Sequence, residues 1–418
     1  MRLNRTMRAA TLAVLMLGLG VPYAGADETC HSPYMSNLIK GQEDYLYVWT
    51  LGVKGMGDGS DKLVTLDVNP KSPKFGQVID QVSVGGRGEA HHARFTDDRR
   101  FLWAGGLDDS KIYVFDIHSN PGKPKLVNTI ADFDKRSGLV GPHTFYALPG
   151  RMLIGAVSNA KDGGGVTGMA LYNNKGDFIR KYDMPVASNA STAPALKGAD
   201  GYGYDLAINP AKNVILSSSF TGKKNYMMPL GTLMKDGAAM KQFGNTMVVW
   251  NLKAMRPEQV LSVPGAPLEI RWSLAPNEDW AITATALTSR LWLVKKDAKG
   301  LWVNTFMDGT TRYFDISNPE GPRQTYAKKT GSQVNMISQS WDGKRVYVSS
   351  SLLANWDKTG ADNEQFVKLY AWDGKALDEK MNVDFYKLKL GRPHHMKFGA
   401  KGAQATAQAG AATQVAAR

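Results

Sequence analysis

The sequence has little of several features that mark common protein classes. It contains one cysteine, Cys30, among 418 residues, so no disulfide can form within the chain. Charged residues make up only 21% and hydrophobic residues 43%, a composition that excludes intrinsic disorder. After residue 26 no apolar run is long enough to cross a bilayer, and helical periodicity is almost absent beyond residue 45. Stability must therefore come from a hydrophobic core rather than from covalent cross-links.

The first 26 residues have the pattern of a secretory signal peptide. Arg2, Arg5 and Arg8 precede an uncharged run over residues 9–20, and Ala24-Gly25-Ala26 provides the small residues that signal peptidase requires. We predict cleavage after Ala26 and export of the mature chain. Removal of three arginines lowers the formal net charge from +13 to +10.

The remaining basic excess is interpreted as a solvated surface. Its lysines and arginines are scattered and accompany no nucleic-acid recognition motif, so no nucleic-acid partner is expected. Cys30 has two interpretations, a structural residue close to the new N-terminus or a reactive thiol.

A repeating β pattern fills the chain from residue 45 onward. Short alternating runs rich in Val, Ile, Tyr, Phe and Trp are separated by Asp, Asn, Gly and Pro turns, and they recur as strand, turn, strand, loop and apolar strand. This unit is typical of a propeller blade. Six units begin at His91-His92, Pro142-His143, Tyr204-Asp205, Pro267-Leu268-Glu269, Val334-Asn335-Met336 and Pro393-His394.

A seventh unit is incomplete, because the strand over residues 311–316 lacks its early hairpin. The strands over 45–50 and 62–68 are predicted to share a blade with the strand after His394, which closes the ring. We therefore predict one all-β domain over residues 27–398, a seven-bladed β-propeller with one shortened blade. Residues 399–418 form an Ala/Gln/Gly tract without an apolar face and are predicted to be a disordered tail.

Five of the seven histidines open a unit of the repeat: His91, His92, His143, His394 and His395. The first strand of each blade lines the axis of a propeller, so these residues are expected to meet at one mouth of the channel. A cluster of neutral imidazoles suits copper or zinc. Strand alternation directs His395 away from His394, and both His91 and His92 can bind only if a bulge turns one of them. The alternative is that each is a hydrogen-bonded structural residue.

Carboxylates also occupy axial positions. Glu269 could orient a metal-bound imidazole or move protons, or it could be a structural partner of Arg271. Asp205 opens another unit.

Several strings resemble the selenium-binding protein family and keep its order from about residue 29 to 398. They are Asp67-Val68-Asn69-Pro70-Lys71-Ser72-Pro73, Glu89-Ala90-His91-His92, Pro142-His143-Thr144, Pro267-Leu268-Glu269-Ile270-Arg271, Tyr313-Phe314-Asp315-Ile316-Ser317-Asn318-Pro319, Asp342-Gly343-Lys344-Arg345-Val346-Tyr347 and Ser351-Leu352-Leu353-Ala354-Asn355-Trp356-Asp357.

The resemblance implies a seven-bladed propeller and, as in exported bacterial members, a periplasmic methanethiol oxidase. It implies copper held by His91, His92, His143 and His394, and oxidation of methanethiol by O2 and water to formaldehyde, hydrogen sulfide and hydrogen peroxide. Glu269 or Asp205 would take the methyl proton. The lead-in that starts at Cys30 also resembles that of bacterial members, which favours an accessory position for this thiol near the site.

The chain departs from the family pattern in three places. Thr50 stands where vertebrate members have a selenium-associated cysteine, so selenium binding through that thiol is not expected. Phe145-Tyr146 replaces a second histidine found after Pro-His-Thr in many members. The chain is shorter between Leu301 and Asp308, and loss of a channel residue there would weaken catalysis.

Three alternatives to an oxidase stay open at this point. A non-catalytic periplasmic carrier of metal or sulfur species would bind copper without consuming O2. A lactonase-type hydrolase would need a calcium site rich in Asp and Asn, and a protein-interaction ring would not need the histidines. The oligomeric state is also open, with a homo-oligomer among the alternatives.

Overall fold

A computed structural model of the protein describes residues 41–186, 196–273, 280–295, 302–304, 310–315, 323–357 and 364–401. The predicted signal peptide, Cys30 and the predicted tail beyond Lys401 lie outside these residues. Within them, no helix has the length and apolar character needed to span a membrane.

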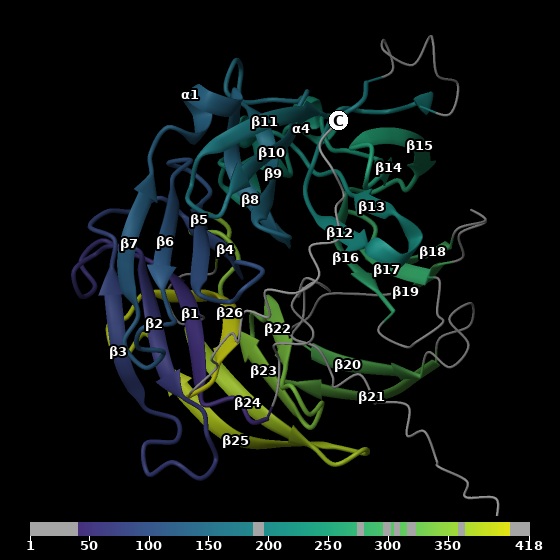
Figure 1. The fold of residues 1–418 in the computed structure, drawn as a ribbon. Coiled ribbons are helices and arrows are strands. Elements are labelled where there is room, and N and C mark those ends of the chain that lie inside the picture. Colours follow the sequence, from purple (N-terminus) through teal and green to yellow (C-terminus); the bar gives the residue numbers. More distant parts are fainter. Residues whose placement is uncertain are drawn as a thin grey trace, which may run out of the picture.

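The strands form sheets arranged around a common centre, which is an all-β propeller (Figure 1). Six sheets have four strands each. Three of them are β26 (Arg392–Gly399), β1 (Tyr45–Leu51), β2 (Lys62–Asp67) and β3 (Val78–Ser83); β4 (Ala90–Phe95), β5 (Phe101–Gly106), β6 (Ile112–Asp116) and β7 (Lys125–Ile130); and β8 (Leu139–Leu148), β9 (Arg151–Asn159), β10 (Gly168–Asn173) and β11 (Phe178–Asp183). The other three are β12 (Leu206–Asn209), β13 (Val214–Ser217), β14 (Thr246–Asn251) and β15 (Arg256–Ser262); β16 (Pro267–Trp272), β17 (Trp280–Thr285), β18 (Arg290–Lys295) and β19 (Trp302–Asn304); and β22 (Met336–Gln339), β23 (Arg345–Ser349), β24 (Phe366–Trp372) and β25 (Leu377–Asp384).

The predicted blade count of seven is corrected to six. Between the blades of β16 and β22 the described residues form a two-stranded sheet, made of β20 (Thr310–Asp315) and β21 (Arg323–Lys329). This sheet stands where the sequence predicted a blade without its early hairpin. Two strands do not complete a four-stranded blade, so the described residues form six full blades and one partial sheet.

The ring closes as predicted, because the C-terminal strand β26 pairs with the N-terminal strand β1. The ladder runs from Leu51 opposite Arg392 to Tyr45 opposite Gly399. Gly399 therefore belongs to the propeller, one residue past the predicted domain boundary. This pairing gives β1 a partner on both sides and places β26 at the inner edge of the blade.

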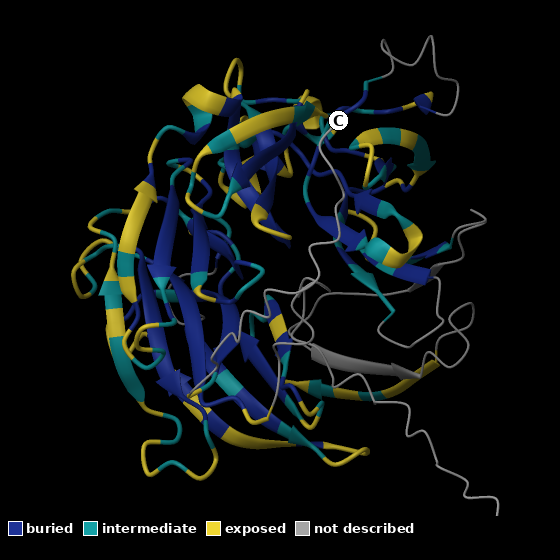
Figure 2. Ribbon diagram, viewed as in Figure 1, coloured by how far each residue is buried: buried dark blue, intermediate teal, exposed yellow. Residues whose placement is uncertain are grey.

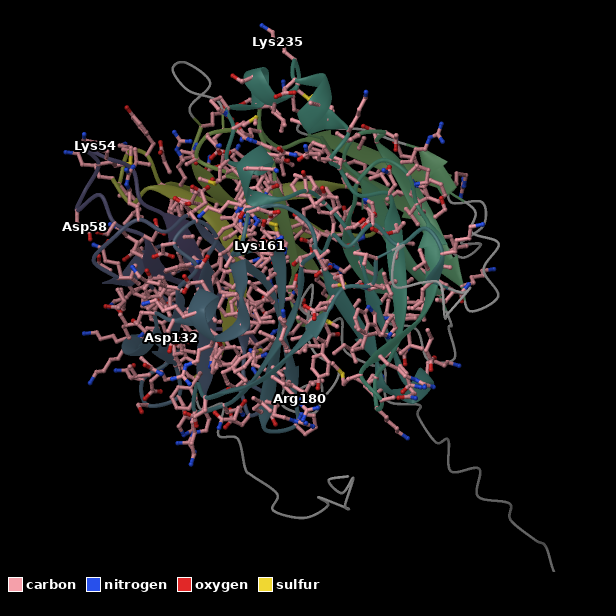
Figure 3. All side chains as sticks on the ribbon, turned by 90° about the horizontal axis from the view of Figure 1, so that it is seen from above. Lys54, Asp58, Asp132, Lys161, Arg180 and Lys235 are labelled. Carbon is pink, nitrogen blue, oxygen red and sulfur yellow. The ribbon has the colours of Figure 1, made fainter. Side chains whose placement is uncertain are left out.

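Burial follows the order of the strands within each blade (Figure 2). All seven residues of β1 are buried, whereas the outermost strand β3 has none that is fully buried. Inner strands are covered by neighbouring blades on both faces, so they are apolar at consecutive positions; outer strands face water on one side and alternate. The labelled charged side chains project from separate parts of the surface, among them Lys54, Asp58 and Lys235 (Figure 3).

Short helices are a feature that the β pattern of the sequence did not predict. They are α1 (Phe133–Ser137), the 3-10 helix Pro210–Lys212, α2 (Lys223–Tyr226), α3 (Leu230–Leu233) and α4 (Gly237–Met240). The last three lie in the connection between β13 and β14. We refer to this connection, residues 218–245, together with the loop 351–357, as the cap.

Candidate metal centre

Five histidines meet at the centre of the ring. His91 and His92 come from β4, His143 from β8, and His394 and His395 from β26, and all five are buried. The His91 ring lies 4.7 Å from that of His92, 4.9 Å from His143 and 4.1 Å from His394, between ring centroids. Side chains that are up to 300 residues apart in the sequence therefore share one site.

A β-bulge lies at every strand position that supplies a histidine. In β4, Ala90 pairs with Gly106 and Ala93 with Ala104, so His91 and His92 together face one residue. In β8 the ladder shifts between Pro142 and Thr144, which leaves His143 as the extra residue. In β26 the partners of Trp49 and Thr50 are His395 and Pro393, which leaves His394 unpaired in the ladder.

The strand that carries Glu269 has the same irregularity. Its ladder with β17 shifts between Pro267 and Ile270, and Glu269 lies inside the shift. A bulge re-aims a side chain and is common beside active sites. The sequence required a bulge for both His91 and His92 to face one site, and the structure has it. Sequence reasoning missed the other three, although prolines precede His143 and His394 and a proline does not fit a regular central strand.

Hydrogen bonds fix one ring nitrogen of two of the histidines. His394 Nδ1 lies 2.7 Å from the carbonyl oxygen of Ser351 and can only donate to it, so Nε2 carries the lone pair. Asn335 Nδ2 also lies 3.2 Å from this Nδ1. The Nε2 atoms of His143 and His394 and the Nδ1 atoms of His91 and His92 are buried and have no hydrogen-bond partner among the described residues. An unpaired imidazole nitrogen aimed at its equivalents is the arrangement of a metal ligand.

The imidazoles are held in the neutral form that metal binding needs. Burial lowers the pKa of His143 to about 3 and that of His394 to about 4. Burial and the neighbouring imidazoles hold the pKa values of His91 and His92 well below the usual value. No proton competes for these nitrogens at neutral pH.

Two groups of three side chains could hold an ion. Ligand atoms lie within 4.8 Å of one another in His91, His92 and His394, and in His92, His143 and Glu269. His395 belongs to neither group, and its ring lies 4.8 Å from that of His92. The donor set of nitrogens with one carboxylate fits copper or zinc.

Glu269 is an ionised carboxylate at the edge of the cluster. Its Oε1 lies 3.6 Å from His92 Nε2, and its Oε2 accepts a 2.7 Å hydrogen bond from Arg271 Nη2. Burial would raise the pKa of Glu269, but Arg271, His143 and Arg94 outweigh it and hold this pKa below the usual value. About a quarter of the side chain is exposed (25%), so the carboxylate can exchange protons with solvent.

Asp205 has a different position. Its side chain is buried, and both oxygens are engaged: Oδ1 accepts from Thr144 Oγ1 at 2.8 Å, and Oδ2 accepts from Ile270 N at 2.8 Å and from Arg271 Nη1 at 3.2 Å. Burial and the neighbouring Glu269 raise its pKa. Thr144 Oγ1 in turn lies 3.1 Å from His143 Nδ1. The hydroxyl can give its one proton to Asp205 Oδ1 or to the Tyr204 carbonyl oxygen at 3.1 Å, so it acts as the acceptor toward His143 Nδ1, which leaves Nε2 free.

The series of hydrogen bonds from His143 through Thr144 to Asp205 can be tested by mutation. Thr144→Val removes the hydroxyl and keeps the shape, so His143 loses its orienting partner and copper affinity should fall by roughly 10–100-fold. Competition titration against a chromophoric copper chelator measures this fall. Thr144→Ser should restore the affinity, and a valine variant that binds copper like the wild type would show that Thr144 does not position His143.

Apolar and aromatic side chains of the cap cover the histidines together with Tyr204, which lies outside the cap, just before β12. Tyr204 packs on the His143 ring at 4.0 Å, and Phe220 packs against Tyr204 at 5.2 Å and against Trp356 at 6.2 Å, between ring centroids. Trp356 Nε1 donates to the Met228 carbonyl at 2.9 Å, which ties the two parts of the cap together. No local pattern in the sequence signals this cover.

Glu89 is a second carboxyl group near the site that sequence reasoning did not single out. It precedes His91 by two residues, has a positive φ of 63°, and accepts a 2.7 Å hydrogen bond from the Ala354 backbone in the cap. Burial, with Asp61 and Asp357 nearby, raises the pKa of Glu89 to about 8. The group is therefore largely protonated at neutral pH and adds little charge beside the histidines.

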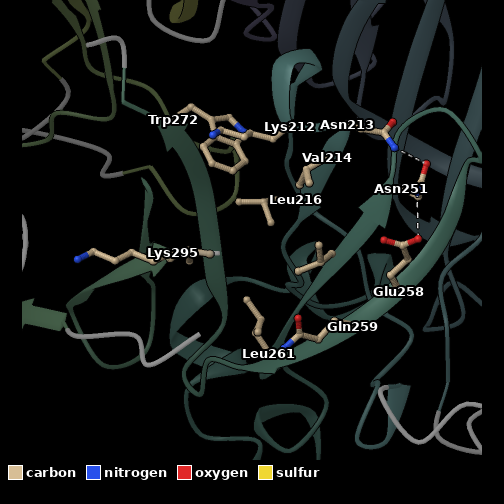
Figure 4. Close-up of a pocket in the computed structure, with 12 residues that line it drawn as sticks. Lys212, Asn213, Val214, Leu216, Asn251, Glu258, Gln259, Leu261, Trp272 and Lys295 are labelled. Carbon is tan, nitrogen blue, oxygen red and sulfur yellow. Dashed lines mark hydrogen bonds between the residues drawn. The ribbon is translucent and has the colours of Figure 1, made fainter. Parts of the chain in front are cut away.

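A separate cavity of about 330 Å³ lies between the blades of β12–β15 and β16–β19 (Figure 4). Its walls include Val214, Leu261 and Trp272. Among the described residues that line it there is no histidine and one acidic residue, Glu258, which accepts a 3.0 Å hydrogen bond from Asn251. This cavity offers no metal-ligating cluster.

Comparison with known proteins places the chain in a family. A family profile described as 56 kDa selenium-binding protein matches residues 25–307. The chain is 57% identical to a methanethiol oxidase of Hyphomicrobium sp over 429 aligned positions, which cover 96% of each protein. It is 53% identical to a methanethiol oxidase of Ruegeria pomeroyi over 422 positions, covering 93% of this chain and 97% of the relative.

Among solved structures, a hypothetical selenium-binding protein from Sulfolobus tokodaii aligns with a TM-score of 0.72. The alignment covers 88% of this chain and 96% of that one at 21% identity, so the likeness concerns the fold.

Proposed function

Since the chain belongs to the 56 kDa selenium-binding protein family, we propose that it is a copper-dependent methanethiol oxidase. The proposed reaction converts methanethiol, O2 and water to formaldehyde, hydrogen sulfide and hydrogen peroxide. Methanethiol loses two hydrogens with their electrons, O2 takes them up as hydrogen peroxide, and water replaces sulfur at carbon.

The observation that carries the proposal is the set of four buried, neutral histidines at the centre of the ring. Each has a ring nitrogen that no described residue engages. Leaving four such atoms buried and unpaired is costly unless an ion takes them up. Bound copper would supply one-electron redox chemistry and would lower the pKa of a thiol that binds to it.

The surrounding side chains have separate roles in this proposal. Glu269 accepts the proton that leaves the methyl group, because its carboxylate is ionised and its Oε1 faces His92. Arg271 fixes the carboxylate through Oε2. Asp205 acts as a positioning residue through Thr144, because both of its oxygens are already engaged.

The apolar cap supports a small thiol as the substrate. Tyr204, Phe220 and Leu268 belong to one apolar cluster next to the histidines. Such a cover favours a methyl group over a charged substrate and keeps bulk water from the reacting atoms. We also propose that the enzyme acts in the periplasm, on the basis of the signal-peptide pattern in residues 1–26.

Elemental analysis coupled to product assays tests the proposal. Protein exported to the periplasm should carry copper, and addition of methanethiol should produce O2 uptake with equal amounts of peroxide and sulfide. Under anaerobic conditions methanethiol should reduce the copper signal. Copper binding without O2 uptake would indicate a carrier instead, and full activity with an unchanged copper spectrum would contradict a redox role for the metal.

A further inference from the structure

Arg94 is a buried cation that the proposed reaction does not use. It lies two residues after His92 on β4, and only 3% of it is exposed. Its Nε and Nη1 atoms are buried without a hydrogen-bond partner among the described residues. A guanidinium is always charged, and burying it with unused donors is energetically unfavourable. The site is therefore built for an acceptor that the protein itself does not provide.

The carboxylates closest to this region are committed to another arginine. Arg271 binds Asp205 Oδ2 at 3.2 Å and Glu269 Oε2 at 2.7 Å. The charge of Arg94 does reach the same region, because it contributes to lowering the pKa values of His143 and Glu269 and opposes the rise in the pKa of Asp205. No hydrogen bond or ion pair joins Arg94 to either carboxylate among the described residues. Arg94 thus faces the histidine site without a carboxylate of its own.

His395 supplies a second unused group in the same place. Both of its ring nitrogens are buried without a partner among the described residues, and its ring lies 4.8 Å from that of His92. An imidazole ring carries at least one N–H, so His395 offers the site a hydrogen-bond donor. Lys397 is also buried and lies two residues further along β26, on the same face of the strand.

We propose that Arg94 and His395 bind a small monovalent anion beside the histidine cluster, and that during turnover this anion is hydrosulfide. The assignment to hydrosulfide rests on the proposed function. Hydrogen sulfide ionises close to neutral pH, and its anion is small enough for a site with two side chains as donors. An arginine N–H and an imidazole N–H are suitable donors for such an anion. The site would hold the sulfur product after carbon–sulfur cleavage and keep it apart from the histidine nitrogens.

Bromide and sulfide probe this site without relying on turnover. Crystals soaked in bromide should show an anomalous peak within hydrogen-bond distance of Arg94 and distinct from the space between His91, His143 and His394. Calorimetry on the full-length, metal-free protein should show sulfide binding that bromide competes with. Metal removal prevents sulfide from binding to copper.

Variants of Arg94 distinguish this site from general anion binding. Arg94→Gln should weaken sulfide binding by at least about tenfold, and Arg94→Lys, which keeps the charge and loses the planar donor fork, should bind with intermediate affinity. If Arg94→Gln does not fold, Arg94→Lys still tests whether sulfide binding depends on the guanidinium. Arg345→Gln is the matched control, because this partly buried arginine is paired with Glu43 at 2.6 Å and belongs to neither histidine group. The sulfide affinity of this variant should be unchanged.

Two results would overturn the proposal: only water on Arg94 in bromide-soaked crystals, or equal sulfide affinity in wild type and both Arg94 variants. Either result in a protein that still oxidises methanethiol would leave the proposed function intact. Sulfide binding that depends on Arg94 in a protein without oxidase activity would instead retain the anion site and refute its link to turnover.

Discussion

Replacing His143 with alanine should remove most of the copper and most of the turnover. His143 lies between His92 and Tyr204, and its Nε2 is one of the imidazole nitrogens that have no hydrogen-bond partner among the described residues. Loss of an outer-shell partner already lowers metal affinity by roughly 10–100-fold, so loss of a ligand should lower it by at least about 100-fold. Elemental analysis and O2 uptake measure the two effects.

Two histidine variants serve as controls for this experiment. His118→Ala changes a partly exposed side chain in the loop after β6 and should leave both copper and activity unchanged. His395→Ala removes a buried histidine that belongs to neither candidate ligand group and should retain copper. Circular dichroism checks that each variant is folded. If the His143 variant keeps wild-type copper and turnover, His143 is not a ligand.

Replacing Glu269 with glutamine should separate turnover from copper binding. Glutamine keeps the size and can still accept from Arg271, but it cannot take a proton, so kcat should fall by roughly 100-fold or more. Copper content should stay close to that of the wild type, because the histidines supply the remaining donors. Steady-state kinetics and elemental analysis on the same preparation give both values.

The pH dependence sharpens this prediction. The pKa of Glu269 lies below its usual value, so the carboxylate is ionised throughout the neutral range. Protonation of this group should lower wild-type kcat/KM only in the acid range, below the usual pKa of a glutamate. Glu258→Gln is the matched control, because Glu258 is half-exposed and lines the separate cavity between the blades of β12–β15 and β16–β19. This variant should have wild-type kinetics. Loss of copper together with activity in the Glu269 variant would identify Glu269 as a ligand instead of a base.

The ring and its closure could be predicted because they depend on local pattern. Period-2 alternation and turn residues mark strands, and the repeat places His91, His143 and His394 at equivalent blade positions. The pairing of β1 with β26 could be predicted because the N-terminal strands and the C-terminal strand each form an incomplete blade on their own and together complete one. The sequence also indicated that one blade is incomplete. That this segment forms a two-stranded sheet depends on which strands pair with each other, and the pattern of a single strand does not specify its partners.

The cap could not be predicted for a physical reason. Each of α2, α3 and α4 has only four residues, which is too short to be stable without tertiary packing, so their sequence carries no helical period. Their stability comes from contacts of Leu233, Ala239 and Phe243 with the apolar cluster of the cap. The place of Trp356, which joins the loop 351–357 to this cluster, depends on the same tertiary contacts.

The sequence by itself determined which side chains are candidates for chemistry, because residue type and blade position are properties of the chain. Only the tertiary structure decided how those side chains act. Bulges set the direction of His143 and His394, Thr144 separates the role of Asp205 from that of Glu269, and the unused donors of Arg94 appear only when every neighbour is in place. The reason is that hydrogen bonds and burial depend on atoms that distant strands bring together, and these strands meet only in the closed ring.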